Sequence, residues 1–202
     1  MSDLLPSMWF QPGFKDNDVV VVLNSPGREE FLANRPAVGK TGQNLELLLS
    51  KIVGVRSRWP LCRRSVEIIN ASRVPHYKDS PDGNEVQEKE IKENIEFAET
   101  RLSMASIRTV LVFGEHAKSL VSQIGQNTLG DKCVCFCRHI GNQGLSVKGL
   151  QGGREYPWPK QRNCDLRTHI EWRIDCVARF LMDSWNKIGF HCAEKYFREC
   201  KA

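Results

Sequence analysis

The stretch VVVVLNSPGREE, residues 19–30, decides the fold, and FLANRPAVGKTGQN, residues 31–44, continues it. Its four valines and one leucine form an apolar run that is too β-branched for a helix and too short for a membrane span. Such a run predicts a strand buried on both faces, as in a parallel sheet covered by helices. Open α/β sheets bind ligands at the carboxyl ends of such strands, so we expect the functional site here. The strand ends in four turn-forming residues, Asn24, Ser25, Pro26 and Gly27.

The chain has 202 residues, of which 41% are hydrophobic, and we therefore expect a single domain over residues 1–202. No apolar run approaches the roughly 18 residues of a membrane span, and the N-terminal MSDLLPSMWFQPGF does not resemble a secretory signal. We expect a cytoplasmic protein without a membrane partner, whose eight cysteines are reduced thiols. The net charge of +5 permits a polyanionic partner without requiring one.

Apolar runs and helical periodicities alternate along the rest of the chain. Together with the first strand they predict a three-layer α/β/α sandwich around a short four-stranded parallel sheet. The other strands are predicted at residues 66–70, 109–113 and 132–138, and the helices at 42–53, 87–104, 115–124 and from Asp165 onward. Residues 141–160, rich in glycine, proline and basic residues, predict a long loop, and residues 190–202 either extend the last helix or pack as a tail.

Two patterns suggest other chemistry and are less well supported. Gly39-Lys40-Thr41 resembles the end of a P-loop, but that motif needs a glycine where Asn34 stands and a strand directly before it. A nucleotide-binding enzyme that uses Lys40 is therefore the weaker alternative. The three cysteines of residues 133–137 alternate along a predicted strand, which favours small core residues over a metal site. Cys164, His169 and Cys176 match no zinc spacing, and no metal is expected.

Polar residues follow every predicted strand. Any one of them is typical of a turn, but the carboxyl ends of parallel strands share one edge of a sheet. Amides, a hydroxyl and an imidazole would therefore converge on a single crevice. The residues concerned are Asn24 and Ser25, Asn70, Gly114 and Glu115, and His139.

Four segments in order resemble the motifs of the uracil-DNA glycosylase superfamily, and its thermophile-type branch in particular. LNSPGREE with RPAVGKTGQNLELLL resembles the first motif, and the other three are INASRVP (69–75), LVFGEHAKSLV (111–121) and HIGNQGLS (139–146). The match covers about residues 19–147. The resemblance implies the fold of that superfamily and an enzyme that flips a pyrimidine nucleotide out of DNA. Such an enzyme hydrolyses the N-glycosidic bond of that nucleotide and leaves an abasic site.

Positions in these motifs imply roles for five residues. His139 would stabilise the departing base, and Asn70 would read the edge of the base. Asn24 or Ser25, with Glu30 as a helper, would position the attacking water, and which of the three does so stays open. Asparagine orients a water without taking its proton, so weak-base catalysis of a dissociative reaction is implied.

Ala37 stands where the first motif has a phenylalanine that stacks on uracil, and with Pro26 and Gly27 it would contact the flipped base. Loss of the ring removes a stacking surface and opens a volume beside the base. A bulky pyrimidine is therefore the favoured substrate, such as the glucosylated hydroxymethylcytosine of phage DNA that antiviral members of the superfamily attack. Removal of uracil or another deaminated base in DNA repair is one alternative. A non-catalytic DNA-binding module is another.

Other departures concern cofactors and DNA contacts. The first cysteine is Cys62, and Val74 stands where the second motif has a cysteine, so no iron–sulfur cluster and no other cofactor is expected. Ile140-Gly141 replaces the Pro-Ser of the histidine motif, and Ser146 would supply the phosphate contact instead.

The loop after the histidine motif supplies the remaining DNA contacts. Leu150 is the predicted wedge into the duplex, with Lys148 and Arg154 as phosphate contacts, unless residues 148–154 form only a solvated loop. Arg73 is a further predicted DNA contact. The expected assembly is a monomer bound to DNA.

Overall fold

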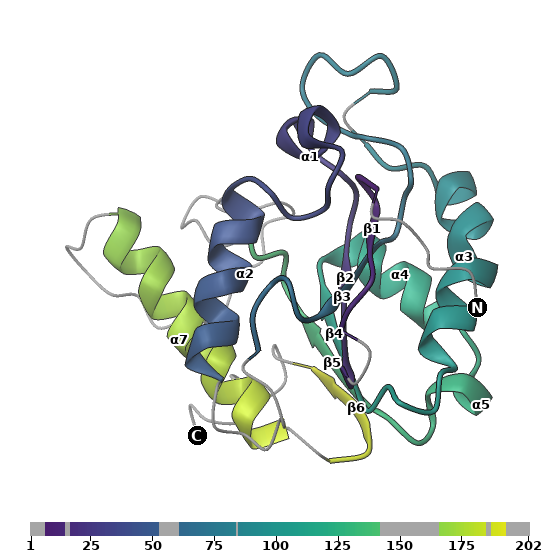
Figure 1. Ribbon diagram of the computed structural model, residues 1–202, viewed down its shortest axis with the longest axis vertical. Helices are drawn as coiled ribbons and strands as arrows, with labels where there is room; N and C mark the ends of the chain where they lie inside the picture. Colours follow the sequence, from purple (N-terminus) through teal and green to yellow (C-terminus); the bar gives the residue numbers. More distant parts are fainter. Residues whose placement is uncertain are drawn as a thin grey trace, which may run out of the picture.

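The computed structural model describes residues 7–14, 17–52, 61–83, 85–141, 166–184 and 187–192. One six-stranded sheet runs through the middle of this part of the chain (Figure 1). Neighbouring strands are parallel except at one edge, where β1 is antiparallel to β3. In sheet order the strands are β1 (Phe10–Gln11), β3 (Glu67–Asn70), β2 (Val19–Leu23), β4 (Thr109–Phe113), β5 (Cys133–Cys137) and β6 (Gly189–Cys192).

The four predicted strands are the centre of this sheet, but the prediction of four strands in all was wrong. β1 adds an antiparallel strand beside β3, and β6 adds a parallel strand beside β5. Residues 189–192 therefore pair with the sheet and neither extend the last helix nor form an unpaired tail. Residues 193–202 lie outside the described ranges.

Strand β2 is buried along its whole length, as its valines predict. Val19, Val21 and Leu23 enter the apolar core on one face of the sheet. Val20 and Val22 enter the core on the other face. A strand with two apolar faces requires helices on both sides of the sheet.

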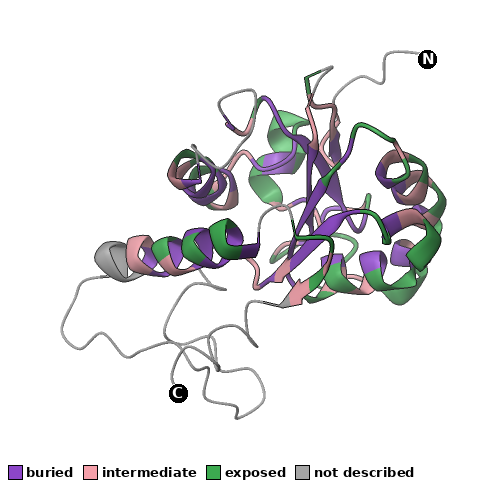
Figure 2. Ribbon diagram, turned by 90° about the horizontal axis from the view of Figure 1, so that it is seen from below, coloured by how far each residue is buried: buried purple, intermediate pink, exposed green. Residues whose placement is uncertain are grey.

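Helices cover both faces, which confirms the three-layer arrangement (Figures 1 and 2). Helices α2 (Lys40–Lys51) and α7 (Leu166–Ser184) contribute apolar residues to one core. Helices α3 (Glu88–Leu102), α4 (Glu115–Gln123) and α5 (Gln126–Leu129) contribute to the other. A short helix, α1 (Arg28–Ala33), lies outside both layers, beyond the carboxyl end of β2 (Figure 1).

The thiols of β5 behave as core residues. Cys133, Cys135 and Cys137 all pack into the core under α2 and α7, whereas Val134 packs into the opposite core. The contact with the Cys133 thiol, together with burial, raises the pKa of the Cys135 thiol, so that thiol stays protonated. Among the described residues, no three His, Cys, Asp or Glu side chains are grouped so that they could hold a metal ion.

No helix within the described ranges is both long and apolar enough to cross a membrane.

Candidate functional site

Four strand ends meet at the carboxyl edge of the sheet, as the sequence predicts. Leu23 of β2 pairs with Asn70, the last residue of β3. On the other side of β2, the backbone N–H of Gly114, after β4, donates to the carbonyl oxygen of Cys137, the last residue of β5. The parallel pairing therefore brings Asn24 and Asn70 to neighbouring strand ends, with His139 two residues beyond the end of β5.

His139 is held as a neutral hydrogen-bond donor. The ring is partly buried, and its Nδ1 accepts a hydrogen bond from the backbone N–H of Gly141 at 3.0 Å. A nitrogen that accepts carries no proton, so the ring proton resides on Nε2. Burial lowers the pKa of His139 below its usual 6.5, the nearby His116 lowers it further, and only the negative charge of Glu30 opposes the shift. No residue in the described part of the chain accepts the Nε2–H, which can therefore donate to a ligand at the sheet edge.

Helix α2 fixes the turn that carries His139. The side-chain amide of Asn44, which is buried, donates to the carbonyl oxygen of Ile140 at 2.7 Å. A Cβ added at Gly141 would lie 2.8 Å from Cε1 and Nδ1 of His139 and 3.2 Å from Oγ1 of Thr41. The turn therefore lies directly on the N-terminal part of α2 and leaves no space for a side chain at residue 141.

Glu30 is the only buried residue of α1, and its carboxylate accepts three backbone N–H groups. These belong to Gly27 at 3.0 Å, Val38 at 3.0 Å and Gly39 at 3.3 Å. The carboxylate therefore ties α1 to the start of α2, and it takes the position where a P-loop would hold a phosphate. The Lys40 ammonium donates to the side chain of Gln43, which is a local helix contact. The arrangement does not support nucleotide binding through Lys40.

Asn24 uses its side-chain oxygen to cap helix α4. Its Oδ1 accepts the backbone N–H of Ala117 at 3.1 Å. Gly114 makes this approach possible, because a Cβ there would lie 2.4 Å from that oxygen and its φ of 101° favours glycine. The amide nitrogen of Asn24 is left to orient a water. The partly exposed Ser25 hydroxyl makes no hydrogen bond to any residue in the described part of the chain. It is therefore less constrained than the side chain of Asn24.

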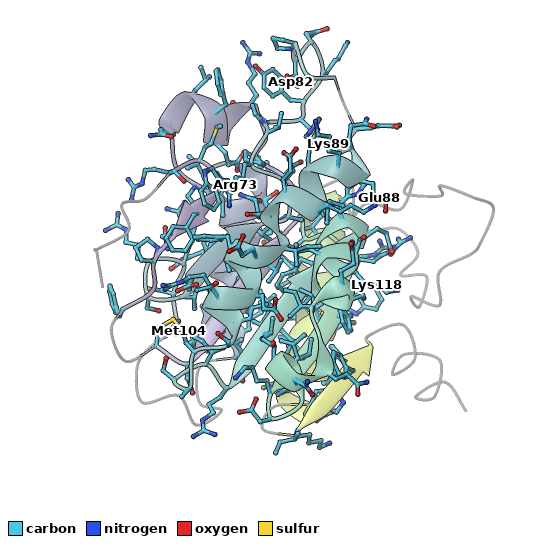
Figure 3. The ribbon with its side chains drawn as sticks, turned by 90° about the vertical axis from the view of Figure 1, so that its right-hand side faces the viewer. Arg73, Asp82, Glu88, Lys89, Met104 and Lys118 are labelled. Atoms are coloured by element: carbon cyan, nitrogen blue, oxygen red, sulfur yellow. The ribbon has the colours of Figure 1, made fainter. Side chains whose placement is uncertain are left out.

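Asn70 and Arg73 are engaged with neighbouring elements. Asn70 is 1% exposed, and its amide donates to the carbonyl oxygen of Met8 at 3.3 Å. The guanidinium of Arg73 donates to Oδ1 of Asn94 at 2.9 Å and lies 4.5 Å from the centre of the Trp9 ring. Arg73 is nevertheless exposed, between the carboxyl edge and helix α3 (Figure 3). It can offer positive charge to a ligand, while Asn70 offers little of its surface.

Ala37 lies in the core, under α2 and α7, and is 1% exposed. Its φ of 51° places it in the left-handed region, and its carbonyl oxygen accepts from Nη1 of Arg63 at 2.6 Å. A Cβ at Gly42 would lie 1.6 Å from that oxygen, so only glycine fits there. The methyl group of Ala37 is therefore covered, and the open volume expected beside it is not visible.

Pro26 and Gly27 shape the entry to α1. The carbonyl oxygen of Pro26 accepts the backbone N–H of His76 at 2.9 Å. The N–H of Gly27 is held by Glu30, as described above, and its carbonyl oxygen accepts from Phe31. Pro26 is buried and Gly27 is half-buried, and both position the loop that carries Ser25.

Two further histidines lie near this edge, and the sequence reasoning missed both. Burial lowers the pKa of His116, at the start of α4, and the charge of His76 lowers it further. His76 is buried, with Nε2 2.7 Å from a carboxylate oxygen of Glu90. A lone histidine after a strand is a weak signal, although the position of His116, two residues after Gly114, could have identified it.

The remaining predicted DNA contacts cannot be placed. Ser146, Lys148, Leu150 and Arg154 all lie outside the described ranges, as do Cys164 and the N-cap candidate Asp165.

No protein-family model matches the chain, and no curated protein compared with it is similar enough to count as a relative. The resemblance to the uracil-DNA glycosylases therefore depends on the four sequence motifs.

Proposed function

We propose that this protein is a monofunctional, metal-independent DNA glycosylase that flips out a pyrimidine nucleotide and hydrolyses its N-glycosidic bond. The observation that supports it best is the state of His139. It is a neutral imidazole at the carboxyl edge of a parallel sheet, with its Nδ1 occupied by Gly141 and its Nε2–H bound to none of the described residues. The four motifs in register lead to the same residue.

A neutral donor suits this reaction. The N-glycosidic bond breaks with its electron pair leaving on the base, so negative charge grows on a base carbonyl oxygen. A fixed N–H aimed at that oxygen stabilises the charge, and loss of one such donor typically costs about 10²- to 10³-fold in rate. The low pKa of His139 keeps the ring neutral, so Nδ1 stays bound to Gly141 and the ring stays in place.

The sugar carries the matching positive charge and is attacked by water at C1′. The oxygen of that water forms the new bond, and its proton passes to solvent. An electron-poor sugar needs only weak assistance, which the Ser25 hydroxyl and the amide nitrogen of Asn24 can give by orienting the water. Glu30 acts at a distance in this mechanism, through its three backbone contacts and its charge near His139.

The substrate we propose first is a bulky modified pyrimidine, such as the glucosylated hydroxymethylcytosine of phage DNA. The argument is the missing phenyl ring at Ala37. The methyl group of Ala37 is covered by core side chains. A bulky base can therefore lie beside it only if the turn at residues 35–39 or those core side chains move. Uracil or another deaminated base, which is smaller, is the alternative substrate.

The test is to incubate the protein with three matched duplexes that contain glucosylated hydroxymethylcytosine, uracil or only unmodified bases. Abasic sites are scored by strand cleavage in alkali, and the released base is identified by mass spectrometry. Abasic sites in the glucosylated duplex support the full proposal. Cleavage of the uracil duplex alone overturns the bulky substrate, and no abasic site in any duplex overturns the glycosylase.

A non-catalytic DNA-binding module is the second candidate. It is favoured by the occupied oxygens of the site, since Asn24 caps α4 and Glu30 binds three backbone N–H groups. His139→Ala distinguishes the two candidates. A glycosylase loses base release and keeps DNA binding, whereas a binding module has no base release to lose.

A further inference from the structure

Helix α1 reverses the usual amphipathic pattern, because it buries a charged side chain and exposes its large apolar ones. Its sequence is REEFLA, and its one buried residue is the carboxylate Glu30. Its two large apolar side chains, Phe31 and Leu32, are 48% and 68% exposed. Helices normally bury such residues and expose charge, so a buried acid beside two exposed hydrophobes is the informative departure.

The backbone around α1 is rigidly held, so Phe31 and Leu32 project from a fixed base. Glu30 binds three N–H groups, as described above, and the carbonyl oxygen of Pro26 accepts from His76. The ring of Tyr77 lies 6.3 Å from that of Phe31, at 38°. Figure 1 shows α1 and the segment after β3 as the parts that rise farthest above the carboxyl edge of the sheet.

This apolar pair lies close to the proposed catalytic residue. Glu30, which precedes Phe31, accepts the backbone N–H of Gly39 at the start of α2. The Gly141 turn that holds His139 lies against Thr41 at the same end of that helix. The exposed charged residues of the segment 28–40 are three basic and one acidic: Arg28, Arg35, Lys40 and Glu29. In the chain this apolar pair is flanked by more exposed basic than acidic residues, which suits a polyanion whose interior is apolar, such as a DNA duplex.

The size of the pair argues against a protein partner. A stable protein interface buries on the order of 1,200 Å² or more, which two side chains on a six-residue helix do not supply. A wedge between base pairs needs only one or two apolar side chains, because unstacking a single base step opens a gap of that size.

We propose that Phe31 and Leu32 form an apolar wedge that enters duplex DNA beside the target nucleotide and favours its extrusion toward His139. This proposal rests on the proposed function, and it adds an element that the four motifs do not contain. It differs from the wedge expected at Leu150, which follows the histidine motif.

The test uses duplexes with 2-aminopurine next to the target pyrimidine, whose fluorescence rises when the target leaves the stack. The target is deoxyuridine or glucosylated hydroxymethyldeoxycytidine, each with a 2′-fluorine that resists hydrolysis. The variant Phe31→Ala/Leu32→Ala should reduce the flipping equilibrium by about tenfold. The variant Phe31→Trp/Leu32→Met should keep it.

The matched control is Phe14→Ala/Ile188→Ala. These side chains are 60% and 70% exposed, similar to the wedge pair, but they lie toward the opposite, amino-terminal edge of the sheet. The control should flip the target as the unmodified protein does. All four positions are exposed, so thermal unfolding of every variant should match that of the unmodified protein.

Base release from the same duplexes without fluorine separates the two proposals. If the unmodified protein releases the base and the α1 variant flips the target equally well, the wedge is overturned and the glycosylase is not. Loss of flipping in the α1 variant without any release supports the wedge and overturns the glycosylase. No fluorescence rise with the unmodified protein overturns the wedge. So does a homodimer that dissociates in the α1 variant, because α1 would then bind a second copy of the chain.

Discussion

At the residue scale, the site depends on which atoms of a polar side chain are already engaged. The sequence identifies Asn24, Glu30 and His139 as polar residues at strand ends, but it does not show their partners. The partners change the roles. The Asn24 oxygen caps a helix and leaves the amide nitrogen as a donor, and the Glu30 carboxylate binds backbone N–H groups. His139 keeps an Nε2–H that no described residue accepts. The Asn24 contact joins residues far apart in the chain, whereas the partners of Glu30 and His139 lie within nine residues and depend on how the local turns fold. A sequence pattern specifies neither kind of contact.

Gly141→Ala tests whether the orientation of His139 matters. The added methyl would lie 2.8 Å from the imidazole ring and 3.2 Å from Thr41, so the ring must move. Because misplacement of a catalytic group by about 1 Å can cost about 100-fold in rate, we expect the rate of single-turnover base release to fall by about 10- to 100-fold. Gly125→Ala is the control, because nothing lies within 4 Å of its added Cβ. Equal rates for both variants would show that His139 is not the donor.

Glu30→Gln tests whether Glu30 acts through position and charge or as the base. The negative charge of Glu30 raises the pKa of His139, so its removal lowers that pKa further. The acid limb of the pH–rate profile should therefore move to lower pH, with base release at neutral pH largely retained. Loss of a charged acceptor for three partly buried N–H groups should cost about 2 kcal/mol in the free energy of unfolding. Collapse of the rate at neutral pH would instead identify Glu30 as the base.

At the scale of elements, the site is assembled from helix N-termini rather than from the sheet alone. Asn24 caps α4, Asn44 of α2 holds the His139 turn, and Glu30 joins α1 to α2. Each contact links a strand end or loop to the first turns of a helix. The active geometry should therefore be sensitive to changes that loosen these helix ends.

Asn24→Ala and Asn24→Asp separate the capping role of Asn24 from its role toward water. Alanine removes the acceptor for the Ala117 N–H and should lower the free energy of unfolding by about 1 kcal/mol. Aspartate keeps that acceptor and should preserve stability, as measured by urea unfolding. Aspartate lacks the amide nitrogen. If Asn24→Asp is stable but releases the base slowly, the amide nitrogen of Asn24 is the group that orients the water. If Asn24→Asp releases base at the normal rate, Ser25 is the residue that orients water.

The segment after β3 is anchored to α3 by a half-buried carboxylate, that of Glu90. Glu90 accepts the Ser72 hydroxyl at 2.6 Å and lies 2.7 Å from Nε2 of His76. Burial raises the pKa of Glu90, but these hydrogen bonds and the charge of His76 outweigh it, so the pKa lies below its usual 4.5. A lowered folded-state pKa contributes stability that is present above 4.5 and is lost as pH falls through the lowered value.

Glu90→Gln should therefore flatten the acid side of the stability profile. Urea unfolding from neutral pH down to strongly acidic pH measures the effect. Below the usual pKa of 4.5, the unmodified protein should lose stability more steeply than the variant. Glu96→Gln, at an exposed position on the same helix, should keep the full slope. Identical slopes for Glu90→Gln and the unmodified protein would contradict the role given to the Ser72–Glu90–His76 contacts.

At the scale of the whole molecule, the sequence predicts the centre of the fold and misses its edges. The four central strands contain short apolar runs, and their predicted bounds agree with the structure within about one residue. The predicted bounds of α2, α3 and α4 agree within about two residues. β1 has only two residues, and β6 contains the polar His191, so neither carries an apolar run that identifies a strand. α1 has six residues and buries a carboxylate instead of an apolar stripe, so helical periodicity does not identify it.

The predicted convergence of the four strand ends is confirmed, because it follows from the parallel order of the sheet alone. The details of the site depend on tertiary contacts. The sequence pattern does not contain the burial of Ala37, the engaged oxygens of Asn24 and Glu30, or the proximity of His76 and His116 to the site.

The most direct test of the central claim is the rate of base release in single-turnover assays with the unmodified protein and His139→Ala, measured across acidic and neutral pH. We predict abasic sites whose rate of formation stays constant through pH 6.5, the usual pKa of histidine, and falls only at lower pH. We also predict a loss of at least about 100-fold in His139→Ala. A rate that halves near pH 6.5, or equal rates for the two proteins, would contradict a neutral His139 as the catalytic donor.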